Sequence, residues 1–386
     1  MRKAVSVNAM PVKTYRWLKM NEETLELQDV AAFTSIAPEE KLPAGVTVQH
    51  NRDDAAIAEV FRDAVVRMKA ADKDAVLPNG DVLLAGMQQD VPTGMGAAVN
   101  ALMEEAKVPV SVYTVEANAK PAEPLSLRFT PGEGSAVLSR QVFHVKQGAE
   151  ITILMDYYAL KKTQGFFGVQ SYLYAEEGAK VKIVRVQMLG EDFTHFDDFG
   201  AVCEKEAQAE TVRLELGAHH AFSGLVVNLL GDDAAYTGET GYLCRREQQY
   251  DYNHVATHRG KKTSGNLYFH GVLLDHGKKM LRGTIDFRKG AAGADGDENE
   301  DTLQMSPDAV NRTVPIILCQ EEDINGHHGA TIGQLSDELL FYMQSRGISE
   351  EEAKKIVIRA KIMRVANLIP EGDLRSHVNA FLCDTL

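Results

Sequence analysis

Short runs of alternating polar and apolar residues fill the chain from about residue 120 to 320, with polar turns and no helical stretch between them. The clearest runs lie at 150–155, 180–186, 211–216, 225–230, 241–244, 266–274 and 283–288. Gly-Ala pairs recur beside these runs, at Gly148-Ala149, Gly178-Ala179 and Gly217-Ala218. Alternation is typical of strands with one buried face and one face in water. The pattern predicts an all-β sandwich, barrel or solenoid and by itself does not choose among the three.

The segment before this region reads as mixed α/β and is expected to span residues 1–115. Asp53 or Asp54 can cap a helix whose apolar residues recur at helical spacing. Those residues are Ile57, Val60, Phe61, Ala64, Val65 and Met68. The other elements predicted here are a short buried strand at 81–85, a helix at 97–106 and a strand at 108–115.

Gly94-Met95-Gly96 stands directly before the second of these helices. A dinucleotide-binding loop needs a third glycine, which the chain lacks at this point. The segment therefore predicts a turn that enters a helix.

A helical module is expected at 331–386, after a strand-rich core at 116–330. Ser336 can cap its first helix with a side-chain oxygen, and Gly347 can end it in a left-handed conformation. The apolar residues Leu339, Leu340 and Met343 share one face of this helix.

A second helix of this module opens at Ser349, which forms a capping box with Glu352. Its predicted apolar face consists of Ala353, Ile356, Val357, Ala360, Met363 and Ala366 or Leu368. A third short helix is predicted at 373–381. About 55 residues form too small a core for a strong independent domain.

The charge balance limits the classes of partner. The chain has 55 acidic and 41 basic residues, a net charge of −14. Nucleic acids and anionic membranes attract clustered Lys and Arg, so neither is expected as a partner. No stretch approaches the ~20 apolar residues that span a bilayer, and the first ten residues lack the apolar run of a signal peptide.

The four cysteines are Cys203, Cys244, Cys319 and Cys383, with no CxxC pair among them. Such wide spacing indicates reduced thiols in a cytoplasmic protein and no disulfide framework. Cys244 and Cys319 each end a strand-like run, which favours buried core thiols. Whether any of the four is functional stays open.

Four histidines fall within 23 residues: His254, His258, His270 and His276. His254 and His258 have the i, i+4 spacing of a zinc helix, but no Glu follows the first of them and the context is strand-like. A metal-dependent β-solenoid hydrolase or lyase using these two histidines is one alternative. The other interpretation is hydrogen-bonded structural histidines, and the identity of any metal is unknown.

Two further groups receive mainly structural interpretations. His327 and His328 are expected in a turn before a helix, where His328 either satisfies backbone groups or acts as a ligand at a subunit surface. The acidic run Asp295, Asp297, Glu298, Glu300 and Asp301 lacks the ligand spacing of a calcium loop and predicts a solvated loop. There is no serine nucleophile elbow, Walker loop or convincing carboxylate pair, so the chain is not expected to be an enzyme.

Several segments, in order, resemble one known family. The run at 327–349, HHGATIGQLSDELLFYMQSRGIS, closely resembles the C-S-H-G-A-T-V-G-Q-L pattern of the SufD branch of the SufB/SufD iron–sulfur cluster assembly proteins. Upstream, 254–258 looks like the family's H-x-A-P-H, 267–273 like its Y-K-G-V-L, and 282–285 like its F-N-G-x-I. Pro11 with 16–19 is similar to the amino-terminal tryptophan segment of SufD-type chains.

The resemblance implies a fold and a set of partners. The fold is a right-handed parallel β-helix between an N-terminal α/β region and a C-terminal helical module. The function implied is a scaffold of the SUF system. A SufD-type and a SufB-type chain pair through their β-helices, the helical module docks a SufC-type ABC ATPase, and a transient iron–sulfur cluster forms at the paired interface.

Departures from the family's patterns sharpen this expectation. Glu300 stands where SufB-type chains have a cysteine, and Gly329 stands where they have a glutamate, so the resemblance favours the SufD role. His328 matches the SufD histidine that faces the cluster, but the cysteine expected two residues earlier is Gly326. Cys319 is not a positional substitute for it. The resemblance therefore implies a histidine ligand from this chain and thiolates from its partner.

A SufB-like scaffold acting as a homodimer is the second alternative. The sequence gives no indication of the complex stoichiometry, the cluster type or whether a flavin binds.

Overall fold

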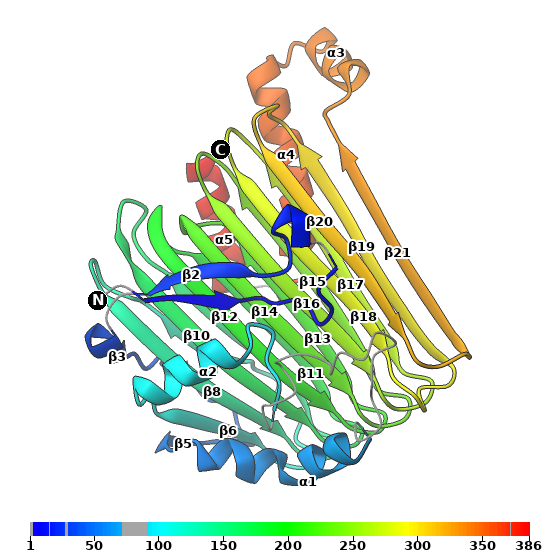
Figure 1. The fold of residues 1–386 in the computed structure, drawn as a ribbon. Helices are drawn as coiled ribbons and strands as arrows, with labels where there is room; N and C mark the ends of the chain where they lie inside the picture. The colour runs from blue at the N-terminus through cyan, green and yellow to red at the C-terminus, as the bar shows by residue number, and fades with distance from the viewer. Residues whose placement is uncertain (1–2, 15, 28–29, 72–90, 371) are drawn as a thin grey trace.

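The centre of the molecule is a pair of parallel β-sheets, and successive strands of the chain alternate between them (Figure 1). The structure, a computed structural model, describes residues 3–14, 16–27, 30–71, 91–370 and 372–386. We call the two sheets even and odd after the numbers of their strands.

The parallel strands of the even sheet are β6 (Val110–Val115), β8 (Ala136–Val145), β10 (Gln164–Ala175), β12 (Asp192–Cys203), β14 (His220–Leu229), β16 (Gln249–His258), β18 (Lys278–Phe287) and β20 (Val310–Cys319). Those of the odd sheet are β7 (Leu125–Phe129), β9 (Glu150–Tyr158), β11 (Lys180–Met188), β13 (Gln208–Glu215), β15 (Ala235–Cys244), β17 (Ser264–Leu273), β19 (Ala294–Gln304) and β21 (Ile324–Gly333). Three N-terminal strands extend the sheets, namely β3 (Thr34–Ser35), β4 (Glu39–Lys41) and β5 (Val46–Arg52).

This alternation makes the core a parallel β-solenoid, as the family resemblance predicts. Side-chain hydrogen bonds between stacked turns join residues 28, 29, 30 or 31 positions apart, which is the length of one turn. Between two parallel strands of one sheet, the chain must run back to the end at which the first strand began. Here the facing strand in the other sheet provides that return, so no crossover helix is needed.

Two of the three Gly-Ala pairs, Gly148-Ala149 and Gly178-Ala179, mark turns that lead into odd strands, whereas Gly217-Ala218 precedes the even strand β14. Gly148 and Gly178 have φ angles of 66° and 67°, the left-handed region that glycine enters without strain. The equivalent positions in later turns keep the left-handed backbone, with other residue types at Glu206, Asp233 and Lys262 and a glycine again at Gly293. A small buried residue follows each time: Ala149, Ala179, Ala207, Ala234, Thr263 and Ala294. The repeat is therefore regular in backbone geometry and loose in sequence.

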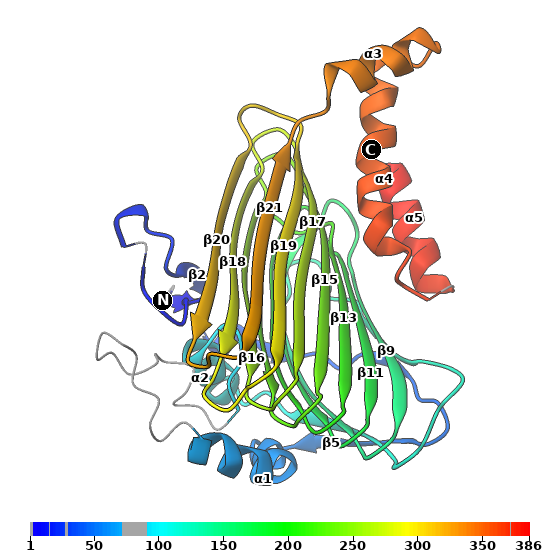
Figure 2. The ribbon, with the colours of Figure 1, turned by 90° about the vertical axis from the view of Figure 1, so that its right-hand side faces the viewer.

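The interior between the two sheets holds the main hydrophobic core, and helices cover the outer faces (Figure 2). Outside the odd sheet lie α4 (Glu350–Ala366) and α5 (Asp373–Thr385). Outside the even sheet lie α1 (Ala55–Ala71), α2 (Ala97–Glu105) and the hairpin of β1 (Lys3–Val7) with β2 (Glu23–Leu27). α3 (Asp337–Ser345) has no buried residue. Two short 3-10 helices, at Arg16–Leu18 and Val30–Ala32, complete the described elements.

The N-terminal predictions agree with these elements. α1 buries Ile57, Phe61, Ala64, Val65 and Met68 of the predicted stripe, and α2 follows the glycine-containing turn. The strand predicted at 108–115 is β6. The strand predicted at 81–85 lies outside the described residues.

The predicted face of α4 is wrong in part. Ile356 is 43% exposed, whereas Ile358, Ile362 and Val365 pack against the odd sheet. A window of β-branched and alanine residues offers apolar side chains on more than one side of the helix. The outer face of β11, β13 and β15 selects the side that is buried.

No helix in the described part of the chain combines the length and the apolarity of a membrane-spanning segment.

Candidate functional site at the open end of the solenoid

The solenoid ends in two unpaired strand edges. β20 is the last strand of the even sheet and β21 the last of the odd sheet, and both lie at the same end of the stack (Figure 2). Most residues of these two strands are half-buried or exposed, in contrast to the buried strands behind them. A free edge presents main-chain N–H and C=O groups to another chain. We call this end of the solenoid, formed by β20 and β21, the open end.

His327 and His328 lie within β21, so the prediction of a turn at these residues is wrong. The strand continues to Gly333, and its register pairs His328 with Glu298 and His327 with Asp297. Glu298 is 2% exposed and faces the solenoid interior. Paired residues on adjacent parallel strands share a face, so His328 faces the interior side of the open end and His327 the outer side. Both histidines are exposed, because no further turn covers them.

The acidic run is also not a solvated loop. It forms β19, and alternate residues point into the solenoid. Glu298 and Glu300 are 2% and 0% exposed, whereas Asp295 and Asp297 remain on the outer side. The sequence does contain a sign of this strand, because Glu298, Glu300 and Thr302 occupy alternate positions and would lie on one face of a strand. The high charge of the segment hid that signal.

Glu300 is fully engaged in the interior. Its carboxylate accepts hydrogen bonds from Lys279 Nζ at 2.6 Å and from Thr302 Oγ1 at 2.6 Å. Thr313 Oγ1 and Asn311 Nδ2 donate further bonds, the second at 3.3 Å. Burial raises the pKa of Glu300, but the Lys279 ammonium and these donors outweigh burial, and the net pKa is lowered. Glu300 is therefore a structural carboxylate.

Glu298, two residues earlier on the same strand, is not engaged in this way. Its Oε1 is buried and has no hydrogen-bond partner in the described part of the chain. Across the interior lies Gly283, where a Cβ would stand 2.8 Å from Glu298 Cγ. Burial raises the pKa of Glu298 to about 8, and the charge of Glu300 raises it as well. Glu298 Oε1 thus lies buried without a hydrogen-bond partner among the described residues, on the strand next to His328.

The cysteines divide into two groups. Cys203 and Cys244 are buried, and burial raises the pKa of each thiol to about 12, so both are inert core residues. Cys319 is exposed, which corrects its prediction as a core thiol, because β20 has no covering strand. Its Sγ lies 2.9 Å from the carbonyl oxygen of Glu321. Cys383 is exposed on α5.

The histidines proposed for zinc are sealed inside the solenoid. His254 Nε2 bonds to Ser223 Oγ at 2.9 Å, and His258 Nδ1 bonds to Thr263 Oγ1 at 2.8 Å. Both face the interior because i and i+4 fall on one side of a strand. Over the residues with a described position, no group of three or more His, Cys, Asp or Glu could hold a metal ion. The geometry of a zinc hydrolase is thus not present at these two histidines.

Replacing His258 with Gln should reduce the acid sensitivity of the fold. Burial lowers the pKa of His258 from 6.5 to about 4, so between these values the unfolded chain binds the proton and the folded chain does not. Stability is therefore lost as the pH falls from 6.5 to 4, by up to about 3 kcal/mol for this group. Urea unfolding at both pH values should show a smaller loss in the variant than in the wild type.

The matched control is His276→Gln, at an exposed position in a turn. It should keep the wild-type loss of stability on acidification. An equal loss in all three proteins would contradict the assignment to His258.

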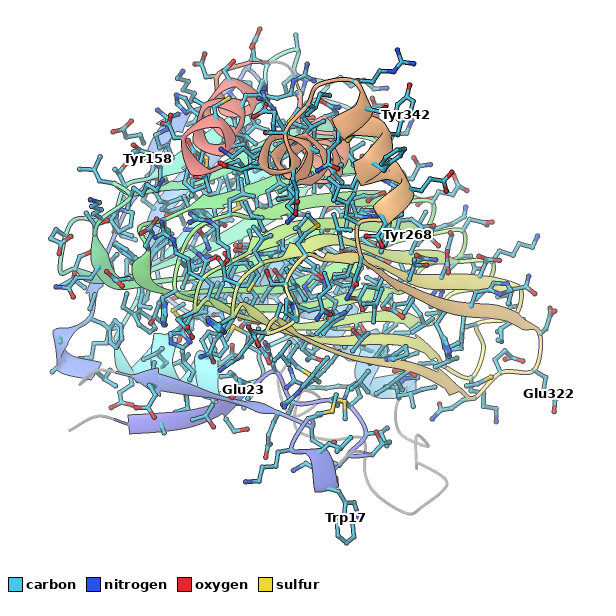
Figure 3. The ribbon with its side chains drawn as sticks, turned by 90° about the horizontal axis from the view of Figure 1, so that it is seen from above. Trp17, Glu23, Tyr158, Tyr268, Glu322 and Tyr342 are labelled. Atoms are coloured by element: carbon cyan, nitrogen blue, oxygen red, sulfur yellow. The ribbon has the colours of Figure 1, made fainter. Side chains whose placement is uncertain are left out.

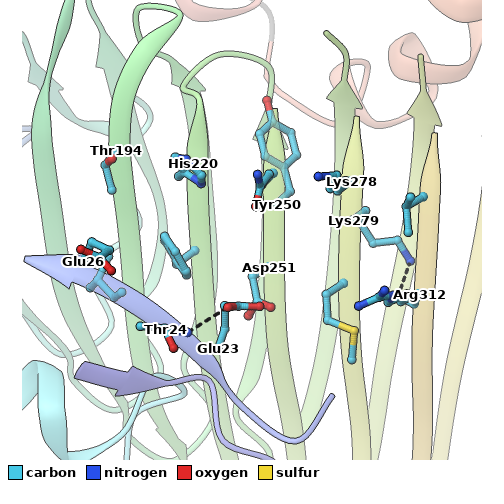
Figure 4. Close-up of a pocket in the computed structure, with 15 residues that line it drawn as sticks. Glu23, Thr24, Glu26, Thr194, His220, Tyr250, Asp251, Lys278, Lys279 and Arg312 are labelled. Carbon is cyan, nitrogen blue, oxygen red and sulfur yellow. Dashed lines mark hydrogen bonds between the residues drawn. The ribbon is translucent and has the colours of Figure 1, made fainter. Parts of the chain in front are cut away.

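A groove of about 410 Å³ lies between β2 and the outer face of the even sheet (Figure 4). Its charged lining combines both signs, from Glu23, Glu26, Asp251, Lys278, Lys279 and Arg312. Asp251 is held by Arg282 Nη1 at 2.8 and 2.9 Å and by Asn8 Nδ2 at 2.6 Å. The bond from Asn8 ties the N-terminal segment to the solenoid, and the bonds from Arg282 join β18 to β16.

Exposed aromatic side chains mark two protruding segments (Figure 3). On α3, Phe341 is 72% and Tyr342 is 56% exposed. In the N-terminal segment, Trp17 is 97% exposed. Apolar side chains gathered on a protruding helix are typical of protein-binding surfaces.

The architecture is thus a parallel β-solenoid with an open end and a helical module outside one sheet. The family model described as "SUF system FeS cluster assembly, SufBD core domain" matches residues 128–361. The chain therefore belongs to the SufB/SufD family of iron–sulfur cluster assembly scaffolds, and its relatives of the SufD type match the larger share of it.

Individual relatives agree with this assignment. The chain is 25% identical to SufD of Bacillus subtilis over 238 residues, which cover 61% of this chain and 54% of that protein. It is 22% identical to SufD of Escherichia coli over 366 residues, 93% of this chain and 85% of that protein. SufB of Bacillus subtilis is 28% identical over 169 residues, 44% of this chain and 36% of that protein. The match thus spans about half the length of the Bacillus SufD.

Proposed function

We propose that this chain is the SufD-like scaffold subunit of a SUF complex and pairs with a SufB-type chain through its open end. The observation that carries the proposal is the pair of unpaired edges, β20 and β21, at one end of the solenoid. A partner solenoid can add its own strands to both sheets and cover the interior at the same time. The chain itself performs no turnover in this proposal.

The helical module at 331–386 is the second part of the proposal, as the docking site of a SufC-type ABC ATPase. α4 and α5 hold the module on the odd sheet through Ile358, Ile362 and other buried residues. α3 buries none of its residues and presents Phe341 and Tyr342. The region 116–330 then serves as the pairing core, and the region 1–115 supplies the first strands of both sheets and the cover of the even sheet.

The cluster is cargo at the paired interface. His328 is the ligand that we propose from this chain, because it faces the interior side of β21 and stays exposed. Iron–sulfur clusters are bound mainly by cysteine thiolates. Gly326 and Gly329 offer no side-chain ligand, so in this proposal the partner supplies the thiolates.

Replacing Ile332 with Asp should prevent pairing while the chain stays folded. Ile332 is 53% exposed on β21, in register with the inward-facing Thr302. A charge at this position would be buried by the partner without a counter-ion, which costs several kcal/mol. Co-purification with a SufB-type chain should recover the wild-type complex and lose the variant.

Leu160→Asp is the matched control, since Leu160 is 67% exposed in the turn between β9 and β10. It should pair as the wild type does. Unchanged pairing of the Ile332→Asp chain would count against the open end as the interface. Sedimentation of the wild-type chain alone tests the homodimer alternative.

A further inference from the structure

Two glutamates on one strand face the same interior but differ in their hydrogen bonds. Glu300 receives bonds from Lys279, Thr302, Thr313 and Asn311, whereas Glu298 Oε1 receives none within the described chain. Buried polar atoms in native proteins are normally paired, so an unpaired one requires an explanation. The contrast within two residues shows that the fold can supply donors in this region and does not supply them to Glu298.

Two residues on the strands opposite Glu298 have no donor side chain. Gly283 faces it and has no side chain, and a Cβ there would meet Glu298 Cγ, Cδ and Oε1 within 2.9 Å. On the next strand, the register partner of Gly283 is Pro315, which has no N–H. Neither Gly283 nor Pro315 has a side chain that can donate a hydrogen bond to the carboxyl group.

His328 is the nearest polar side chain in the register towards the open edge. It pairs with Glu298 across β19 and β21, and neighbouring strands lie ~4.8 Å apart. A carboxylate oxygen and an imidazole nitrogen at this spacing can reach one ion. Both ligand types suit ferrous iron.

We propose that Glu298 is a ligand for ferrous iron beside His328, so that the open end supplies a carboxylate–imidazole half-site for incoming iron. This inference rests on the proposed pairing and adds to it a second ligand and the form of the cargo. Two ligands do not complete a coordination shell, in agreement with the absence of a three-ligand group among the described residues. The remaining ligands come from the partner scaffold.

The test compares Glu298→Gln with Glu300→Gln in the complex with a SufB-type chain. Ferrous iron alone is the probe, titrated without oxygen, and thermal melting is recorded for each complex. Loss of a ligand's supporting hydrogen bond already costs 10–100-fold in metal affinity. We therefore expect Glu298→Gln to weaken iron binding by at least about tenfold with an equal or higher melting temperature.

Glu300→Gln is the matched control on the same strand and face. It leaves the Lys279 charge without its carboxylate, so the melting temperature should fall. Iron binding per folded complex should remain within a few-fold of the wild type. Iron affinity of Glu298→Gln equal to that of the wild type would overturn the proposal.

A double-variant comparison shows whether the two ligands hold the same ion. In His328→Ala, the further change Glu298→Gln should cost much less than it does alone, because residues that share one ion are coupled. If Glu298→Gln instead lowers the iron affinity of His328→Ala as much as it lowers that of the wild type, the two residues do not share an ion. That result would overturn the proposal.

Failure of the pairing can be told apart from failure of the half-site. If no complex forms with the wild-type chain, the proposed pairing is wrong. The same titration on the single chain then decides the role of Glu298. Weaker iron binding by Glu298→Gln supports the carboxylate ligand there, and equal binding overturns it.

Discussion

Replacing Lys279 with Met is expected to lower the free energy of unfolding by about 3–5 kcal/mol, because it leaves the Glu300 carboxylate buried without its cation. Both side chains are 0% exposed, and Lys279 Nζ lies 2.6 Å from Glu300 Oε1. Hydroxyl groups of Thr302 and Thr313 cannot replace a full positive charge. Urea unfolding measured against the wild type gives the change directly.

The double variant Lys279→Met/Glu300→Leu serves as the control. Removing both charges leaves no buried ion without its counter-ion, so much of the lost stability should return. A double variant as unstable as the sum of the two single variants would show that the residues act independently. That result would contradict a stabilising ion pair between Lys279 and Glu300.

Replacing Phe341 with Asp is expected to weaken binding of a SufC-type ATPase by about 2–4 kcal/mol, roughly thirty-fold to several-hundred-fold. Phe341 is 72% exposed on a helix that buries none of its residues, so the change should leave the melting temperature of the chain unaltered. Calorimetric titration of the ATPase into the purified chain measures the effect.

The matched control is Val66→Asp. Val66 is 63% exposed on α1, on the outer side of the even sheet, away from the helical module. This variant should bind the ATPase as the wild type does. Equal loss in both variants would indicate a general effect of the added charge, and no loss in either would move the docking surface away from α3.

Much of the secondary structure follows from local chemistry and can be predicted from the sequence. The alternating runs are strands, and the glycine-alanine pairs at 148–149 and 178–179 are left-handed turns. The caps at Ser336 and Ser349 form as expected, accepting N–H groups at 3.1 and 3.2 Å. These features depend on neighbours a few residues away, which a single sequence displays.

The errors share one cause. The charge of the run 295–301 predicts a loop and the glycines around His327-His328 predict a turn, but both segments are strands of the last turns. The exposed state of Cys319 and the buried side of α4 are likewise set by which strands lie next to them. Strand pairing over 28 to 31 residues overrides local composition at these positions.

The sequence by itself determined a strand-rich core with capped helices behind it, and through its ordered motifs the family to which the chain belongs. Only the tertiary structure decided the register, and with it the two roles of Glu298 and Glu300. The physical reason is that both residues have the same local pattern. The donors that separate them, on Lys279 and Thr313, come from other strands, and the register alone brings those strands to Glu300 and leaves Glu298 beside Gly283.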